Sequence, residues 1–376
     1  SSPYSMFGLG EMASGLYGQN TSMAGVTVGM REGMLMNIEN PAGLTALDSC
    51  KLFAEASAFV KNERYRSDGS SSNAFTGNFS AFSLGGRIMR RWYMSAGVTP
   101  YSFVGYYFKS SQELEGSPGT FVTSTFSGTG GLSKAFLSQG FSLTKHLSVG
   151  MNLNFIFGNM TLNEIQSAMT VSREMSGRSF YADFGLQYHR PIARETFLTV
   201  GAIYGYKQRI SLKNTVTVTG SSTETPYNQK RVTQYLPQYI GIGSSLAHKK
   251  WTYALDYLFR QYGVLNSSDS RVKFRDSHEL RLGVCYFPNG FSSSSYWKRM
   301  SYKAGVSVST PYLRLKGQSG GAYRVSVGLG LPVLNGRINT AFYYDRLQLQ
   351  GNALRRDIMG FTVTYTLSEK FYQVKL

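Results

Sequence analysis

The sequence is poor in the features that mark soluble enzymes and helical membrane proteins. It contains two cysteines in 376 residues, Cys50 and Cys285, too few for a disulfide framework, so a single pair and two free thiols both remain open. Only 10 residues are proline and 16% are charged. No window approaches the ~18 consecutive apolar residues that a membrane-spanning helix requires. The sequence therefore predicts neither a disulfide-stabilised scaffold nor a helical bundle in a membrane.

Motifs for catalysis and metal binding are also missing. The four histidines, His146, His189, His248 and His278, are scattered without metal-ligand spacing. There is no Gly-x-Ser-x-Gly elbow, phosphate-binding loop or dinucleotide fingerprint in a strand–turn–helix context. Asp183 and His189 share a predicted strand, but six residues separate them by ~20 Å. We expect no enzymatic activity, no cofactor and no metal.

The positive charge does not indicate a nucleic-acid-binding protein. The formal net charge is +18, but the basic residues are dispersed and form no basic helix, zinc-finger spacing or RNA-recognition motif. In a membrane barrel, basic residues can lie at the rims beside anionic head groups. We therefore expect contact with membrane lipid and no binding of nucleic acid.

Aromatic residues and glycine are abundant, and apolar residues alternate with polar ones. The chain has 26 Tyr, 24 Phe and 41 Gly. Between Tyr323 and Leu331, the odd-numbered residues are apolar and the even-numbered residues are Arg, Ser and Gly. Similar alternation runs from Trp251, from Ser277 and from Leu147. Many such blocks span 11–18 residues, beyond the ~5–6 typical of soluble strands and enough for the ~9–11 that cross a bilayer. Aromatic residues often end the apolar faces, as interfacial girdles require.

Counting these blocks predicts an all-β protein, a closed antiparallel transmembrane barrel of fourteen strands over residues 51–376. The predicted strands are 52–65, 74–90, 92–109, 121–138, 145–165, 177–189, 195–219, 230–246, 250–262, 275–287, 300–310, 321–332, 336–350 and 355–372. Long polar connections at 66–73, 109–120, 166–176, 220–229, 263–274 and 311–320 alternate with mostly short ones. Such barrels have short periplasmic turns and long outer loops, so we expect a bacterial outer-membrane protein with its N-terminus on the periplasmic side. Such a protein loses a signal peptide on export, so we expect Ser1 to lie near the mature N-terminus.

Residues 1–50 differ from the rest, because they alternate little and are rich in Gly, Met and Ala. An irregular backbone is costly in lipid and has to lie in water or inside the barrel. A fourteen-stranded barrel is too wide for wall side chains alone to fill. We therefore predict that residues 1–50 form a plug, partly helical, in the lumen.

The predicted plug contains a short motif. A small-residue stretch, Ser22 to Gly29, is followed by Asn40, Pro41 and Ala42, and the first predicted strand comes directly afterwards. In this the chain resembles the FadL family of outer-membrane long-chain fatty-acid transporters. The family carries an Asn-Pro-Ala motif in an N-terminal hatch of short helices inside a fourteen-stranded barrel. The resemblance implies that fold, a hydrophobic ligand, and a hatch centred on Asn40, Pro41 and Ala42. The opening Ser2 to Gly10 departs from the family pattern.

The third predicted strand provides a second point of resemblance. Pro100 lies inside it, between Gly97 and Phe103, although proline cannot donate a ladder hydrogen bond. Family members have a kink in this strand that opens a lateral gap in the wall. The resemblance implies that Gly97, Pro100 and Phe103 line such a gap; a simple β-bulge without a passage remains the alternative.

Strand alternation places several charged residues on the lumen side. The candidates are Arg260, Glu279, Arg281, Lys303 and Arg324, with Lys207, Asp183, Asp256 and Asp345 as further members or partners. Most are expected to form wall networks that pair buried charges. One or two of them are expected to meet the head group of a ligand.

Two functions remain open. The first is passive uptake of a hydrophobic, fatty-acid-like compound, by hatch movement and lateral exit through the third-strand gap. The second is a non-transporting accessory or scaffold subunit of a larger outer-membrane machine for secretion or assembly, with periplasmic or outer-membrane protein partners. The basic short turns (Arg90 and Arg91, for example), the long 288–299 connection and the atypical N-terminus favour this second function.

Overall fold

The computed structural model describes residues 5, 8–13, 18–67, 70–113, 116–167, 169–220, 224–265, 272–288, 294–315, 317, 319–352 and 354–370. Ten residues of the predicted plug (1–4, 6–7 and 14–17) therefore lie outside the described residues, as do parts of the predicted connections and the last six residues. No helix in the described part is both long and apolar enough to span a bilayer.

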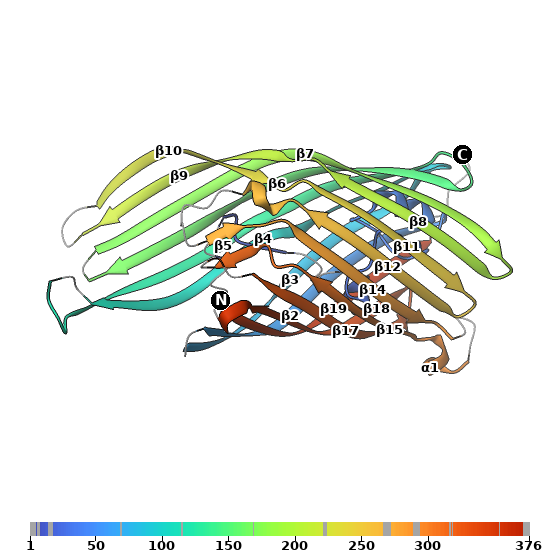
Figure 1. The fold of residues 1–376 in the computed structure, drawn as a ribbon. Helices are drawn as coiled ribbons and strands as arrows, with labels where there is room; N and C mark the ends of the chain where they lie inside the picture. Colours follow the sequence, from blue (N-terminus) through green and yellow to red (C-terminus); the bar gives the residue numbers. More distant parts are fainter. Residues whose placement is uncertain are drawn as a thin grey trace.

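The described chain forms one antiparallel barrel whose wall contains fourteen strands. Two wall strands are each interrupted once: β8 (Thr196–Gly205) continues as β9 (Gln208–Thr219), and β10 (Glu224–Leu236) continues as β11 (Tyr239–His248). The other wall strands are β2 (Lys51–Ser67), β3 (Ser70–Met89), β4 (Trp92–Glu113), β5 (Phe121–Ser142), β6 (Leu147–Gln166), β7 (Met169–Ala193), β12 (Trp251–Arg260), β14 (Ser277–Tyr286), β15 (Ser301–Ser309), β17 (Gly320–Val333), β18 (Gly336–Leu349) and β19 (Arg355–Lys370). Figure 1 shows these tilted strands around an elongated barrel.

The wall closes between its first and last strands. β19 pairs with β2 along its whole length, from Arg355 opposite Arg66 to Lys370 opposite Lys51. Successive strands otherwise pair in chain order, and each of the fourteen predicted blocks corresponds to one wall strand. The predicted fold class, an all-β antiparallel fourteen-stranded barrel, is confirmed.

Some predicted connections are wrong. Most of the predicted loop 166–176 belongs to two strands, because β6 ends only at Gln166 and β7 begins at Met169. The predicted loop 220–229 likewise includes the start of β10 at Glu224. Polar residues do not mark a loop here, because a β-hairpin that extends beyond the apolar band keeps its backbone pairing while both of its faces meet water.

The two ends of the barrel are named here for use below. The basic-turn end carries the two-residue turns 90–91, 194–195 and 249–250, and the other end is called the opposite end.

The remaining elements are short. They are β1 (Glu11–Met12), the 3-10 helices η2 (Gln19–Met23), η3 (Pro41–Ala46), η4 (Tyr262–Val264) and η6 (Gln350–Asn352), the β13 (Val272–Phe274) and β16 (Leu313–Leu315) pair, and α1 (Tyr296–Arg299). The helix α1 lies in the connection 288–299 at the basic-turn end. The two cysteines are both free.

Alternation in the wall separates an apolar outer face from a polar inner face. On β17, Val325 and Val327 are about half exposed on the outside, whereas Ser326 between them is buried. At the basic-turn end, aromatic rings pack along the outer surface, such as Trp251 with Tyr286 at 4.6 Å between centroids. The outer face therefore has the apolar band and aromatic edge expected of transmembrane strands.

The N-terminal segment, meaning the described residues from Ser5 to Leu47, contacts the inner face of many wall strands. At Gly201 on β8, an added Cβ would lie 2.1 Å from the carbonyl oxygen of Val28. At Gly305 on β15, it would lie 2.3 Å from the carbonyl carbon of Met23. Glycine at these places lets the backbone of the segment approach the wall more closely than any side chain would allow. The first wall strand, β2, begins at Lys51, shortly after this segment.

Candidate ligand cavity and wall gap

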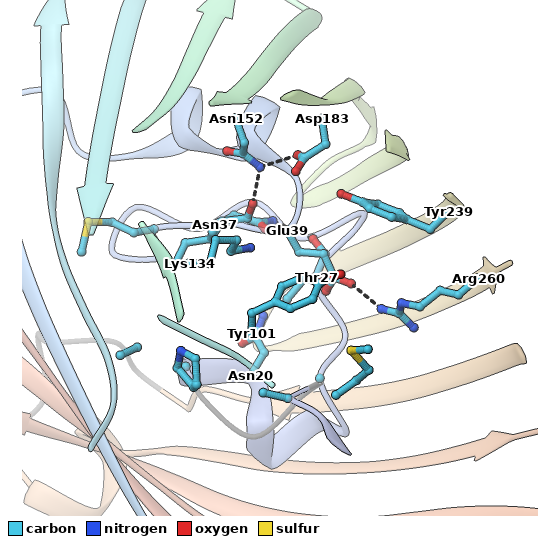
Figure 2. A pocket seen from close by; sticks show the side chains of 18 of the residues that line it. Asn20, Thr27, Asn37, Glu39, Tyr101, Lys134, Asn152, Asp183, Tyr239 and Arg260 are labelled. Carbon is cyan, nitrogen blue, oxygen red and sulfur yellow. Dashed lines mark hydrogen bonds and ion pairs between the residues drawn. The ribbon is translucent and has the colours of Figure 1, made fainter. Parts of the chain in front are cut away.

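A cavity of about 200 Å³ lies between the N-terminal segment and the wall. The segment contributes Met12, Asn37 and Glu39 to its lining, while the wall contributes residues from β2 to β14. Figure 2 shows Lys134, Asp183, Tyr239 and Arg260 pointing toward the segment from different strands, with Glu39 and Thr27 facing them.

Tyrosines give the cavity its mixed character. Tyr101, Tyr181, Tyr206, Tyr239 and Tyr262 all line it, together with Leu35, Met36, Ile38 and Leu236. A tyrosine ring presents apolar faces and one hydroxyl. The cavity thus offers a largely apolar surface with a few polar groups, which is the usual lining of a small-molecule site.

A network of four charged residues borders the cavity and joins the segment to the wall. Arg281 contacts Glu39 at 3.1 Å and Glu279 at 2.8 Å. Arg260 contacts Glu279 at 2.9 Å and Glu39 at 3.4 Å. Burial on its own would raise the pKa of Glu39, but Arg281 and Arg260 outweigh it and hold the pKa below its usual value. Glu39 is therefore ionised, and the two arginines are neutralised by two carboxylates.

Further polar contacts attach the segment to the wall on both sides of this network. Asp256 on β12 accepts hydrogen bonds from the backbone N–H groups of Thr27 (2.7 Å) and Val28 (3.0 Å). On the other side, Arg337 on β18 pairs with Glu32 at 2.5 Å. Burial would raise the pKa of Glu32, but Arg337 and Lys303 together lower it.

The Asn-Pro-Ala motif starts the helix η3. The Oδ1 of Asn40 accepts a hydrogen bond from the N–H of Ala42 at 3.2 Å, and Pro41 occupies the first helical turn, where its missing N–H costs nothing. The Nδ2 of Asn40 donates to the carbonyls of Val28 (2.7 Å) and, on β7, Leu186 (3.2 Å). Asn40 thus caps a helix, holds the segment together and attaches it to the wall.

The wall is interrupted between β3 and β4. These strands pair only from Phe82 opposite Val98 to Met89 opposite Trp92. Beyond Val98, toward the opposite end, β4 continues to pair with β5, with a bulge between Pro100 and Ser102. A cavity of about 570 Å³ lies at this place and is lined by residues of β3, β4, β5 and neighbouring strands. The hydroxyls of Ser80 and Thr99, both among its lining residues, are buried without a hydrogen-bond partner.

The three residues predicted for the gap have different positions. Pro100 lines the gap cavity, and Phe103 lines it too, with its ring 6.1 Å from that of Phe59. Gly97 lies in the last paired stretch, where an added Cβ would be 2.1 Å from the carbonyl oxygen of Phe82. Ala81 and Pro100 line both the gap cavity and the inner cavity, so the two cavities adjoin there.

Comparison with known proteins places the chain in a family. A family model described as BamG matches residues 1–375. The chain belongs to the BamG family. No curated protein sequence matches it.

Solved structures show the fold of this BamG-family chain to be FadL-like. A FadL homologue from Pseudomonas aeruginosa superposes with a TM-score of 0.64 at 11% identity, covering 96% of this chain and 100% of the other. The Pseudomonas putida toluene transporter TodX gives 0.63 at 16% identity, with 96% and 100% covered. The CymD monoaromatic hydrocarbon channel gives 0.60 at 13% identity, with 94% and 98% covered.

The predicted lumen charges of this BamG-family barrel do not form one site. Arg260 and Arg281 line the inner cavity. Arg324, paired with Asp345 at 2.5 Å, and Glu279 line a separate polar cavity toward the opposite end, which Arg260 also borders. Lys303 lies elsewhere, 3.2 Å from Asn339. Two charged residues of the inner cavity were not predicted from the sequence: Glu39, next to Asn40, and Lys134, the single charged residue of β5. Each is an isolated charge in an otherwise uncharged stretch, and this isolation could have identified them.

Proposed function

We propose that this BamG-family chain lies in the bacterial outer membrane and takes up hydrophobic compounds through a lateral gap in its wall. In this proposal the N-terminal segment is a hatch in the lumen, and the basic-turn end faces the periplasm. The observation that carries the proposal is the meeting of the inner cavity with the wall gap at Ala81 and Pro100. A compound in the inner cavity would need to pass only these two small side chains to reach the wall.

The chemistry of the cavity agrees with an apolar or weakly amphipathic ligand. The tyrosine rings and aliphatic side chains would cover its apolar part, while Lys134 and the tyrosine hydroxyls would meet a polar group if it has one. Lateral exit avoids carrying an apolar molecule through the whole aqueous lumen. The solved structures titled as transporters and channels of toluene and monoaromatic hydrocarbons support this class of ligand.

Hatch movement would be confined to a small part of the N-terminal segment. Residues 19–47 are attached to the wall through Glu32, Glu39, Asn40 and the acceptor Asp256. β1 meets the wall through two ladder pairs, Glu11 with Phe103 and Met12 with Ser102, and through an ion pair between Glu11 and Arg356 on β19. Met12 and Ala13 line the inner cavity, so displacement of β1 would widen the cavity beside the gap.

A bulky side chain at the junction of the cavities tests the route. Ala81→Trp should fill the passage and lower uptake at least tenfold for toluene and for long-chain fatty acids, measured in cells that lack other hydrophobic uptake proteins. Ala304→Trp adds the same side chain to β15, which does not line either cavity, and should leave uptake unchanged. Equal uptake by wild type, Ala81→Trp and a strain lacking the protein would contradict the transport proposal.

A second function, as a non-transporting subunit of a larger outer-membrane assembly, is favoured by one surface. The helix α1 exposes Trp297 by 69% beside Lys298, and the nearby turn exposes Leu334 by 89%. The hydroxyl of Tyr296 donates to the carbonyl of Pro332 at 3.2 Å, which holds these two turns together. Trp297→Ser with Leu334→Ser should release stoichiometric partners during gentle extraction and affinity purification. If the wild type purifies without a stoichiometric partner, this second function fails while the transport assay is unaffected.

A further inference from the structure

Four arginines gather on the outward face of three neighbouring strands, at the opposite end of the barrel. Arg64 and Arg66 lie on β2, Arg355 lies on β19 and Arg346 lies on β18. Because β19 pairs with both β2 and β18, the four positions are contiguous on the wall (Figure 1). The inward residues beside them are buried, as Tyr65 is, so the arginines lie on the lipid-facing side.

The pairing register brings like charges together on this face. Arg66 lies directly opposite Arg355, and Arg64 lies opposite Asp357. Arg346 lies opposite Asp357 from the other side. At this end of the three strands, Asp357 is the only acidic residue among the described outward positions, so the four cations share one carboxylate. Like charges directly opposite each other in a sheet are destabilising. This repulsion indicates that an anion from outside the chain lies between the arginines.

Asp357 orients two of the arginines without occupying all of their donors. Its carboxylate accepts hydrogen bonds from the Nε of Arg346 at 2.9 Å and from the Nε of Arg355 at 2.8 Å. The hydroxyl of Tyr344 donates to the same carboxylate at 2.6 Å. One Nη of Arg355 also reaches Asp357, at 3.4 Å. The other Nη of Arg355 and both Nη groups of Arg346 have no acceptor among the described residues, so an external group can take them.

Arg64 and Arg66 are not held by the chain. Both side chains are exposed, and neither makes a hydrogen bond or an ion pair within the described part of the protein. A guanidinium is a planar group with five N–H donors, and it binds phosphate through two parallel hydrogen bonds. Lysine, as a point charge, lacks this geometry. A cluster made entirely of arginine therefore fits a phosphate group.

The arginines begin just beyond the apolar band of β2. The outward positions of this strand are apolar from Leu52 to Val60, and the first polar one is Asn62. Ten positions at ~3.3 Å each give ~33 Å along the strand, which a tilt of ~40° reduces to a height of ~25 Å, as in outer-membrane barrels. Tyr344 lies in the same register row as Asn62, and its ring is 6.2 Å from that of Tyr323. The arginines are therefore at the level of the lipid head groups.

The outward side chains next to the cluster, toward the basic-turn end, are apolar. Met359 and Phe342 are about half exposed, and Val60 and Phe361 are exposed almost as much. The surface thus has the two parts of an amphiphile in the same order, with guanidinium groups at the head-group level and apolar side chains at the depth of the acyl chains.

We propose that the four arginines bind the phosphate of a glycolipid in the outer leaflet of the outer membrane. Basic residues at the head-group level recognise anionic lipids, and the outer leaflet of such a membrane is built largely of phosphorylated glycolipid. The phosphate would neutralise the opposed Arg66 and Arg355, and the acyl chains would lie on Met359 and its neighbours. The inference rests on the orientation in the proposed function, in which the basic-turn end faces the periplasm, but it concerns a separate site on the outside of the wall.

Binding of lipid by the purified barrel tests the proposal. In mild detergent, the wild type should bind phosphate-bearing lipid A at least tenfold more tightly than the same lipid without its phosphate, measured by native mass spectrometry. Arg64→Gln with Arg66→Gln should abolish this preference, and the barrel should still fold because neither side chain contacts another described residue. As the matched control, Arg178→Gln with Lys213→Gln removes the same charge from exposed positions on β7 and β9 and should leave binding unchanged.

Thermal unfolding of the same proteins gives a second measurement. Without glycolipid, Arg66→Gln should unfold at or above the midpoint of the wild type, because the repulsion from Arg355 is removed. Phosphate-bearing lipid A should raise the midpoint of the wild type but not that of Arg64→Gln with Arg66→Gln.

Three results would overturn the proposal. They are a wild type without preference for the phosphate-bearing lipid, an equal loss of binding in the two double variants, and tighter binding of phosphatidylglycerol than of lipid A. The last result would place this end of the barrel at the inner leaflet. A failed uptake assay would leave these measurements unaffected, because they use the purified protein and no transported compound.

Discussion

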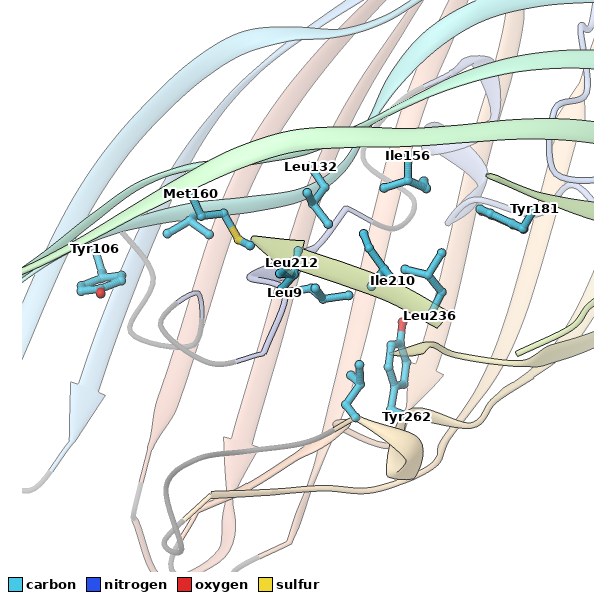
Figure 3. Packing of buried hydrophobic residues seen from close by; sticks show 12 residues of the cluster. Leu9, Tyr106, Leu132, Ile156, Met160, Tyr181, Ile210, Leu212, Leu236 and Tyr262 are labelled. Atoms are coloured by element: carbon cyan, nitrogen blue, oxygen red, sulfur yellow. The ribbon is translucent and has the colours of Figure 1, made fainter. Parts of the chain in front are cut away.

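The two halves of the barrel interior are filled by different means. In the half toward the basic-turn end, many inward side chains are polar and bind the N-terminal segment, as Arg281, Asp256 and Arg337 do. In the half toward the opposite end, inward side chains such as Leu132, Ile156, Met160, Ile210 and Leu212 are apolar and pack against each other (Figure 3). Leu9, from the start of the chain, is fully buried in the same apolar cluster.

This difference teaches that alternation in a barrel does not imply a uniformly polar lumen. Many polar inward residues pair with the N-terminal segment, as Asp256 does, whereas Arg324 and Asp345 pair with each other within the wall. Between β4 and β10, toward the opposite end, the inner face forms its own hydrophobic core. The position of the inner cavity follows, since it lies where these two kinds of packing meet: Glu39 and Arg260 line it from one side, and Tyr181, Tyr262 and Leu236 belong to the apolar cluster on the other.

Removing Arg281 should have the largest effect on the polar half. Arg281→Met leaves Glu39 and Glu279 without their best partner in a site where the arginine is only 2% exposed. Leaving a buried charge unpaired typically costs about 3–5 kcal/mol. We expect a clearly lower unfolding midpoint in denaturant for the detergent-solubilised barrel. Arg346→Met removes an arginine that is 31% exposed and pairs with Asp357, and it should change the midpoint little. Equal losses for both variants would contradict the role given to the buried network.

A cavity in the apolar half should have the next largest effect. Ile156 is fully buried in the cluster of the opposite half, and Ile156→Ala should lower the free energy of unfolding by about 2–5 kcal/mol. Val327→Ala, at a lipid-facing position, should cost much less because its surroundings are fluid. The measurement is denaturant unfolding followed by tryptophan fluorescence. A loss at Ile156 no larger than at Val327 would mean that the apolar half is not a packed core.

Loss of the Asn40 side chain should loosen the N-terminal segment without unfolding the wall. Asn40→Ala removes the helix cap and two donor bonds, and a cap alone contributes ~1 kcal/mol. We expect faster proteolytic cleavage within residues 18–47 and an unchanged barrel on heat-modifiability gels. Asn40→Asp keeps the capping oxygen but not the donors and should give an intermediate rate; no difference among the three proteins would show that the motif does not hold the segment.

Acidification should have the smallest effect and concerns Glu39. Because Arg281 and Arg260 lower its pKa in the folded state, its contribution to stability is complete above the unfolded pKa of ~4.3. That contribution is lost as the pH falls through the lower, folded value. In the wild type, the proteolysis rate of the segment should therefore start to rise only below about pH 4.3. In Glu39→Gln this part of the pH dependence should be absent. A pH profile of proteolysis identical to that of the wild type would show that Glu39 does not contribute to holding the segment.

Several features could be read from local sequence because they depend on local chemistry. The fourteen strands follow from period-2 alternation, since lipid on one side and protein or water on the other impose the same pattern on every wall strand. The start of the wall at Lys51 follows from the change in composition after residue 50. Pro100 marks an interruption because its missing N–H excludes a regular ladder wherever it lies.

Other features required partners that are distant in the chain. Arg260 and Arg281 were recognisable as inward charges, but Glu39, their counter-ion 221 and 242 residues away, was not. The apolar inner face of the opposite half was not predicted, because alternation alone does not show which inward residues, such as Leu132 and Ile156, will pack together. The open edge of β3 was invisible in sequence, since only the divergence of β3 from β4 exposes it.

The sequence by itself thus determined that the chain is a membrane barrel of fourteen strands with an N-terminal segment of a different kind, because backbone satisfaction in lipid allows few alternatives. The tertiary structure decided where the interior is polar, where it is packed, and where the wall stays unpaired. Those properties depend on contacts between residues hundreds of positions apart, and no periodicity along one strand encodes which neighbour it will meet.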